Sequence, residues 1–152
     1  YNKDLQVGIM VETPASVFMA DQFIKYVDFF SIGTNDLSQY TLAVDRGNEN
    51  INNLYNNFNP AVLRAIKHVI DQSHKAGKWT GMCGQFASDT EATKLLLGLG
   101  LDEFSASSSK VAEVKDTILK SNLKEEEEFS NSLLELETVE EIEEKIKNHN
   151  NM

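Results

Sequence analysis

Apolar runs of five or six residues alternate along this chain with longer segments that have helical periodicity. Nearly continuous apolar runs are typical of parallel strands that helices cover on both faces, and the helices between them provide the crossover connections. The runs lie at residues 7–11, 27–32 and 79–83, and residues 101–106, which are less apolar, are expected to form a fourth strand. The pattern therefore predicts an α/β fold with four parallel βα units.

The segments between these runs predict the helices and loops. Asn59 is an expected N-cap with Pro60 in the first helical position, and Ser88 and Glu91 have the spacing of a capping box. Residues 45–58 are rich in asparagine and have no clear period, which predicts a long surface loop of the kind that is usually functional. Helices are expected at residues 16–25, where Pro14 opens the helix, and at residues 37–44, 60–77, around 95–97 and 111–119.

Residues 123–152 form an acidic tail. Its charge run, residues 124–128, is expected to be a solvated face. Thr138 and Glu141 have capping-box spacing before a final helix, and His149 is expected in a frayed end. We therefore divide the chain into residues 1–122, the α/β domain, and residues 123–152, a helical tail that packs on the same domain.

Four βα units are half of an eight-unit TIM barrel, which typically contains about 250 residues. An isolated half-barrel would leave two parallel edges and an inner face open, and proteins normally pair or cover such edges. We therefore expect half of a TIM (βα)8 barrel, which by itself either self-associates or is only marginally ordered.

Composition narrows the possible partners and locations. The chain has 152 residues, of which 41% are hydrophobic, so it can form one domain with a core. Its 24 acidic and 14 basic residues give a formal net charge of −10, which argues against nonspecific nucleic-acid binding, because phosphate backbones need a basic surface. A single cysteine cannot form an internal disulfide, and no apolar run approaches the roughly 20 residues that cross a bilayer. No signal peptide is visible, so a cytoplasmic location is expected.

Reactive side chains follow three of the expected strands. The segment VGIMVETPA contains Glu12, FSIGTNDLSQYTLAVDRGN contains Asn35 and Asp36 with Arg46 downstream, and KWTGMCGQFASD contains Cys83. Because parallel strands point their carboxyl ends at one edge of the sheet, we expect the residues at the three strand ends to converge there.

Each candidate has a functional and a structural interpretation. Glu12 and Asp36 are hard oxygen ligands suited to Mg²⁺, but Asp36 would also serve as a helix cap and Glu12 as a charge on the rim. Asn35 would donate its amide to a phosphate or carboxylate oxygen, or hold the turn. Arg46 offers a planar fork for a phosphate, although a single arginine in a loop is usually a surface residue. Cys83 would be a nucleophile, a proton donor or an inert thiol, and none of the histidines has a sequence position that marks it as an activating base.

These motifs, together with LGLDEFSAS, resemble in order and spacing the C-terminal domain of the Enzyme I family of the bacterial phosphotransferase system, the phosphoenolpyruvate-protein phosphotransferases. The resemblance runs from Val7 through the final helix. It implies a phosphoenolpyruvate-binding (βα)8 barrel of which this chain is the C-terminal half. It also implies a homodimeric parent enzyme that transfers the phosphoryl group to one of its histidines and then to the carrier HPr during sugar uptake, releasing pyruvate.

The resemblance also implies a role for each candidate residue. Glu12 and Asp36 would hold Mg²⁺, with Asp36 also in the substrate site. Asn35 would contact phosphoenolpyruvate and Arg46 would bind its phosphate. Cys83 would protonate the enolate carbon, a step that needs a donor held over one face of the enolate.

The chain departs from the family pattern at three positions. Gln85 replaces the usual Glu and Ser88 the usual Gly beside the cysteine, and Ala106 stands where Met is frequent. The family carries its phosphohistidine and HPr contacts in an N-terminal domain, so this chain alone is not expected to phosphorylate HPr. The alternatives are the corresponding domain of a pyruvate, phosphate dikinase or phosphoenolpyruvate synthase, and a non-catalytic dimerisation module.

Overall fold

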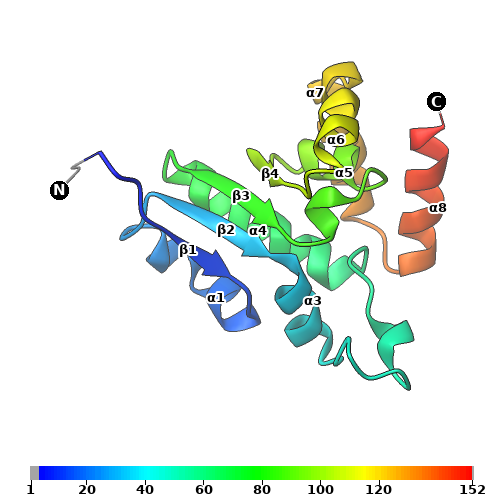
Figure 1. The fold of residues 1–152 in the computed structure, drawn as a ribbon, viewed down its shortest axis with the longest axis horizontal. Coiled ribbons are helices and arrows are strands. Elements are labelled where there is room, and N and C mark those ends of the chain that lie inside the picture. The colour runs from blue at the N-terminus through cyan, green and yellow to red at the C-terminus, as the bar shows by residue number, and fades with distance from the viewer. Residues whose placement is uncertain (1–3, 152) are drawn as a thin grey trace.

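The computed structural model describes residues 4–151 of the chain. Four parallel strands form one sheet in the order β1-β2-β3-β4, so neighbours in space are also neighbours in sequence (Figure 1). This confirms the predicted α/β fold with four parallel strands. Within the described residues β1 and β4 are the edges of an open sheet. The strands are β1 (Gly8–Val11), β2 (Phe29–Gly33), β3 (Trp79–Cys83) and β4 (Glu103–Ser105).

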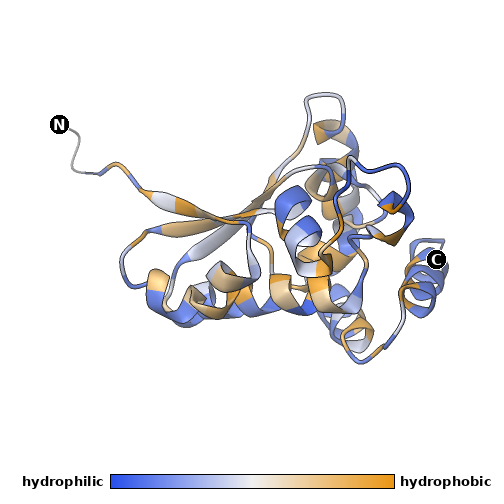
Figure 2. Ribbon diagram, turned by 90° about the horizontal axis from the view of Figure 1, so that it is seen from below, coloured by the Kyte–Doolittle hydropathy of each residue, from blue (hydrophilic) through white to orange (hydrophobic). Residues whose placement is uncertain are grey.

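Helices connect the strands and cover one face of the sheet (Figures 1 and 2). On β1 the side chain of Val11 is fully buried, whereas the neighbouring Met10 is 43% exposed, as alternation along a strand covered on one face requires. The helices are α1 (Pro14–Phe18), α2 (Ala20–Phe23), α3 (Thr34–Leu42), α4 (Pro60–Lys75), α5 (Thr93–Gly98), α6 (Val111–Lys120), α7 (Leu123–Leu133) and α8 (Val139–Asn150), with short 3₁₀ turns η1 (Asn52–Leu54) and η2 (Phe86–Ser88).

The long helix α4 forms as the sequence predicts. The Asn59 side chain accepts a hydrogen bond from the backbone N–H of Ala61, and Pro60 is the first helical residue. The apolar stripe of α4 is fully buried against the sheet and joins the core residues of β2 and β3. This stripe consists of Val62, Ile66, Val69 and Ile70.

Two predictions of helix geometry are wrong. The helix that Pro14 was expected to open does begin there, after a capping box formed by Thr13 and Ser16, but it does not run unbroken to residue 25, because it is split into α1 and α2 at Met19. The capping box expected from Ser88 and Glu91 does not form. Ser88 lies in η2, and its hydroxyl accepts a hydrogen bond from the backbone N–H of Ser107 at 3.0 Å, so it is engaged with the chain after β4.

The acidic tail contains two helices that pack on the rest of the protein. Leu133 of α7 and Ile142 and Ile146 of α8 belong to the hydrophobic core. Thr138 and Glu141 form the predicted capping box at the start of α8. None of the described helices is long and apolar enough to cross a bilayer.

Two expectations about charged residues of the tail are wrong. Within the run at residues 124–128, Glu126 is only 4% exposed, because its turn of α7 packs against α5. Its carboxylate lies 2.6 Å from Nε2 of His149, and the His149 ring stacks on Phe129 with centroids 3.7 Å apart. The run is therefore not simply a solvated face, and His149 is not in a frayed end.

Candidate functional site

The carboxyl ends of β1, β2 and β3 lie in register at the C-terminal edge of the sheet (hereafter the edge), which is distinct from the outer strands β1 and β4. Gly33, the last residue of β2, is paired with Cys83, the last residue of β3. Val11 at the end of β1 is paired with Ile32, so Glu12, one residue further, is level with Gly33. The register therefore brings two of the predicted residues, Glu12 and Cys83, level with Gly33, and the turn that carries Asn35 and Asp36 begins directly after Gly33.

Glu12 lies directly over the end of β2. Its carboxylate occupies the space in which a side chain at position 33 would stand, since a Cβ built on Gly33 would lie 2.6 Å from Oε1 of Glu12. Glu12 is half-buried in this position. A glycine is therefore needed at position 33 for steric reasons, because any side chain there would collide with the Glu12 carboxylate.

Asn35 has a defined orientation at the start of α3. Its Oδ1 accepts a hydrogen bond from the backbone N–H of Gln85 at 3.3 Å. A backbone N–H only donates, so this contact assigns Oδ1 to that side and leaves the two amide N–H groups for another acceptor. The main-chain oxygen of Asn35 also accepts from the hydroxyl of Tyr55 at 3.3 Å. Asn35 therefore holds the turn and retains donors for a ligand.

Asp36 and Arg46 form an ion pair beside this turn. Asp36 is in the first turn of α3, where a negative charge is favourable at the positive end of the helix dipole. The N-cap of α3 is Gly33, so the interpretation of Asp36 as the helix cap is wrong. Nη2 of Arg46 lies 3.6 Å from Oδ1 of Asp36, with both side chains about two-fifths exposed. The loop after α3 thus returns Arg46 to the end of the sheet.

Cys83 is half-buried at the end of β3. Its carbonyl oxygen accepts a hydrogen bond from the hydroxyl of Thr34 at 3.1 Å. An open hollow of about 540 Å³ begins at the next residue, Gly84. The hollow is lined by Asn35, Gly84, Gln85, Ser88, Ser105, Ala106, Ser107 and Lys110.

The described residues contain no group of three or more His, Cys, Asp or Glu side chains placed to hold a metal ion. The edge instead combines two carboxylates, an amide, an arginine and a thiol. His74 is engaged elsewhere, because its Nε2 lies 2.8 Å from Oδ2 of Asp102, which also accepts from the backbone N–H of Thr80 near the start of β3. This pair is at the opposite end of β3 from the cysteine.

Two contacts at this edge were missed in the sequence. Thr34 and the backbone of Gln85 connect the turn after β2 to the turn after β3. The only signal for them is the position of Thr34 between a strand-ending glycine and the candidate amide, which by itself does not indicate a contact 49 residues away.

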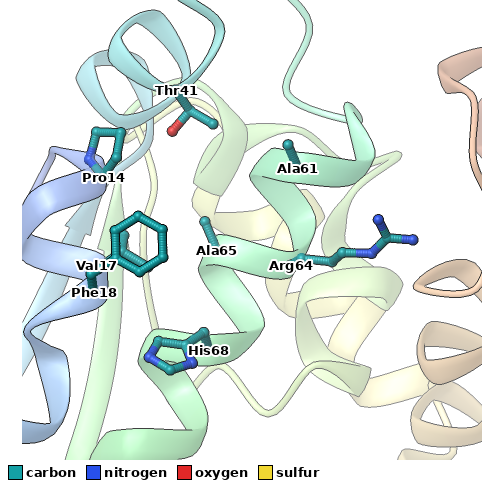
Figure 3. A pocket seen from close by; sticks show the side chains of 8 residues that line it. All are labelled: Pro14, Val17, Phe18, Thr41, Ala61, Arg64, Ala65 and His68. Carbon is teal, nitrogen blue, oxygen red and sulfur yellow. The ribbon is translucent and has the colours of Figure 1, made fainter.

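A second hollow lies on the outer helical side of the protein (Figure 3). It has a volume of about 350 Å³ and lies between α1, α3 and α4. Phe18, at its rim, is 80% exposed. None of the candidate site residues lines it. Its lining consists of Pro14, Val17, Phe18, Thr41, Ala61, Arg64, Ala65 and His68.

Comparison with known proteins gives a consistent result. Residues 1–123 match the family model described as "PEP-utilising enzyme, PEP-binding domain". Three similar proteins bear the name phosphoenolpyruvate-protein phosphotransferase. The one from Buchnera aphidicola (subspecies Schizaphis graminum) is 54% identical over 93% of this chain, that of Haemophilus influenzae 53% over 96%, and that of Bacillus subtilis 52% over 91%. The chain spans about a quarter of the length of each: 25%, 25% and 24%, respectively.

Proposed function

This chain belongs to the PEP-binding domain family of the PEP-utilising enzymes, and we propose that the edge formed by Glu12, Asn35, Asp36, Arg46 and Cys83 binds phosphoenolpyruvate in a phosphoenolpyruvate-protein phosphotransferase. The observation that carries the proposal is the shared register of Gly33 and Cys83, which brings the thiol-bearing strand end beside the turn with the amide and the carboxylate. The relatives' name favours this enzyme over a dikinase or a synthase.

The donor set fits Mg²⁺. This ion takes one or two protein carboxylates and fills its remaining positions with water and substrate phosphate, so two carboxylates at one edge suffice. In the proposed site Glu12 and Asp36 would hold the ion, and the space over Gly33 accommodates the Glu12 carboxylate. When bound, Mg²⁺ would offset negative charge on the substrate oxygens.

Asn35 and Arg46 orient the substrate. The bond from the Gln85 backbone N–H to Oδ1 leaves the amide N–H groups of Asn35 for an oxygen of phosphoenolpyruvate. Arg46 has five N–H donors, of which the Asp36 pair engages only one side, so the remaining donors are free to contact the phosphate.

Cys83 is the proton donor in this proposal. Transfer of the phosphoryl group to a histidine elsewhere in the enzyme breaks the bond between phosphorus and the enol oxygen and leaves the enolate of pyruvate. The S–H proton of Cys83 passes to the methylene carbon of that enolate, which gives pyruvate and a thiolate. The thiolate recovers its proton from solvent before the next turnover.

The four-stranded sheet is, in the same proposal, the C-terminal half of a TIM (βα)8 barrel. Its sequential parallel order is that of a barrel segment, and its edge strands β1 and β4 would pair with the other βα units. The exposed Met10 would then face the barrel interior. The phosphoryl group passes to HPr through a histidine outside this chain.

Self-association is the second part of the proposal. Within the described residues the sheet has two open edge strands, β1 and β4, and Phe18 is 80% exposed at the rim of a hollow; in this chain by itself we assign these surfaces to contacts within a homodimer. Association without ligand binding would instead support the non-catalytic module. Binding of phosphoenolpyruvate and self-association can be measured separately, so the two functions can be told apart.

Titration with phosphoenolpyruvate tests the proposed site. Calorimetry on the full-length protein should show saturable binding in the presence of Mg²⁺ and none with a chelator. Asp36→Ala should weaken this binding by about a hundredfold, since it removes a metal ligand and the partner of Arg46. Asp116→Ala, which removes an exposed carboxylate on α6, is the matched control and should bind normally. Equal binding by both variants would refute the site.

A further inference from the structure

Thr34 is a buried polar residue at the point where the ladder between β2 and β3 stops. It follows Gly33, the last paired residue of β2, and its side chain is fully inaccessible to solvent. Its hydroxyl donates to the carbonyl oxygen of Cys83 at 3.1 Å. The side chain therefore extends the connection between the two strands by one bond beyond the backbone pairing.

A second contact runs in parallel. The backbone N–H of Gln85 donates to Oδ1 of Asn35 at 3.3 Å. Gly84, between the two contacts, has a φ of +102°, and a Cβ there would lie 2.7 Å from Oγ1 of Thr34. The last residue of β3 and the two residues that follow it thus lie against the two residues that follow β2, with no space for a side chain at Gly84.

These contacts determine where the thiol stands relative to the amide. Threonine is stiff about χ1, and full burial restricts it further, so its hydroxyl holds a fixed direction. The hydroxyl fixes the peptide plane of Cys83 through its carbonyl oxygen. The bond to Gln85 fixes the following peptide relative to Asn35. The thiol and the amide are therefore held to one another through the turns rather than by direct contact.

We infer that Thr34 is a positioning residue, which acts through its hydrogen bond to the Cys83 carbonyl to hold the thiol at the distance from Asn35 and Asp36 that proton transfer to the substrate requires. This inference rests on the proposed function of the edge. Thr34 itself touches no substrate atom in this account. Displacement of a reacting group by about 1 Å is enough to lower a rate by about a hundredfold.

Two substitutions separate the hydroxyl from the shape of the side chain. Thr34→Val keeps the volume and removes the donor, whereas Thr34→Ser keeps the donor and removes the methyl group. In the full-length protein, with HPr as acceptor, Thr34→Val should lower kcat for pyruvate release at least about tenfold with KM for phosphoenolpyruvate within about twofold of wild type. Thr34→Ser should recover most of that loss.

Alkylation of the thiol supplies a readout that does not depend on the enzymatic activity. The rate at which iodoacetamide modifies Cys83, followed by the mass of its peptide, should rise at least about threefold in Thr34→Val, because the turn is less restrained, and should stay near wild type in Thr34→Ser. Thr80→Val is the matched control. Thr80 is as fully buried as Thr34 and lies near the start of β3, the strand that ends in Cys83, and its hydroxyl contacts that of Ser73 in α4. It should change neither kcat nor the alkylation rate.

The possible outcomes are distinct. Wild-type kcat and alkylation in Thr34→Val would overturn the inference, as would a serine variant as impaired as the valine variant, because the methyl group would then matter rather than the hydroxyl. A raised KM with unchanged kcat would place Thr34 in substrate binding and also overturn it. Should the wild-type protein itself release no pyruvate, the proposed function fails, and the alkylation rates alone decide whether Thr34 positions the thiol.

Discussion

The close approach of α7 to α5 depends on one glycine, and Gly98→Ala tests it. Gly98 is buried in α5, and a Cβ there would lie well under 3.0 Å from the backbone carbonyl of Glu126 and from Oγ of Ser130. The carbonyl of Glu126 belongs to the backbone of α7 and cannot turn aside as a flexible side chain can. We therefore expect the substitution to push α7 away from α5.

The expected loss of stability combines three contributions. Gly98 is the last residue of α5, so its replacement by alanine gains at most about 1 kcal/mol of helix propensity. Overpacking of a close contact typically costs about 1–3 kcal/mol, and the backbone clash places this case at the upper end. Displacement of α7 also breaks the bond from the Ser130 hydroxyl to the Leu95 carbonyl (3.0 Å), which contributes about 1 kcal/mol. The net destabilisation is about 2–3 kcal/mol, or a fall in Tm of about 4–12 °C for a domain of this size.

Thermal and urea unfolding monitored by circular dichroism would measure this effect, with Gly47→Ala as the control. Gly47 is exposed, the nearest atom to its would-be Cβ is Oδ1 of Asp45 at 3.2 Å, and we expect a change within about 0.5 kcal/mol. A Gly98→Ala protein with wild-type stability would refute the direct packing of α7 on α5. An equal loss in the Gly47→Ala protein would show that the effect is not specific to the helix contact.

Three further predictions concern the tail and the candidate site. Hydrogen bonds from the side chain of Thr138 and from nearby backbone N–H groups hold the pKa of Glu141 below its usual value of 4.5. The stability that these bonds give to α8 is therefore present above pH 4.5 and is lost as the pH falls through the folded-state pKa. Glu141→Gln should remove this acid dependence from hydrogen exchange at the start of α8. His149→Ala leaves the buried Glu126 carboxyl without its imidazole partner and should destabilise the protein by about 2 kcal/mol in urea unfolding, whereas an unchanged midpoint would mean that the pair contributes nothing. Gly84→Ala places a Cβ on a residue with φ +102° and should lower the rate of pyruvate release at least about tenfold, and normal kinetics would show that the turn tolerates a shift.

Much of the fold could be read from local patterns. The strands β1, β2 and β3 form where the apolar runs predict them and β4 lies within the predicted fourth segment, although helices cover one face of the sheet and not both, as such runs suggest (Figure 1). The Asn59 cap and the capping box of Thr138 and Glu141 also form as predicted, since each depends on residues within three positions of one another. Ser88 shows the limit of such reasoning, because its hydroxyl is engaged by Ser107, 19 residues away.

The charges of the tail show the same limit. The charge run at residues 124–128 predicts a solvated face, and four of its five residues are exposed as expected. Glu126 differs only because a glycine on another helix allows its turn to approach closely, and because a histidine 23 residues later returns to pair with it. Neither condition is visible in the local pattern.

The sequence by itself determined the strands, the parallel α/β class and the residue types at the strand ends. These features follow from periodicity, capping and the direction of parallel strands, all of which act over a few residues. Only the tertiary structure decided that Glu12 lies over Gly33, that Arg46 returns to Asp36, and that Thr34 holds the carbonyl of Cys83. Those contacts depend on register and on the path of loops between distant segments, and side-chain positions of this kind are set by packing in three dimensions.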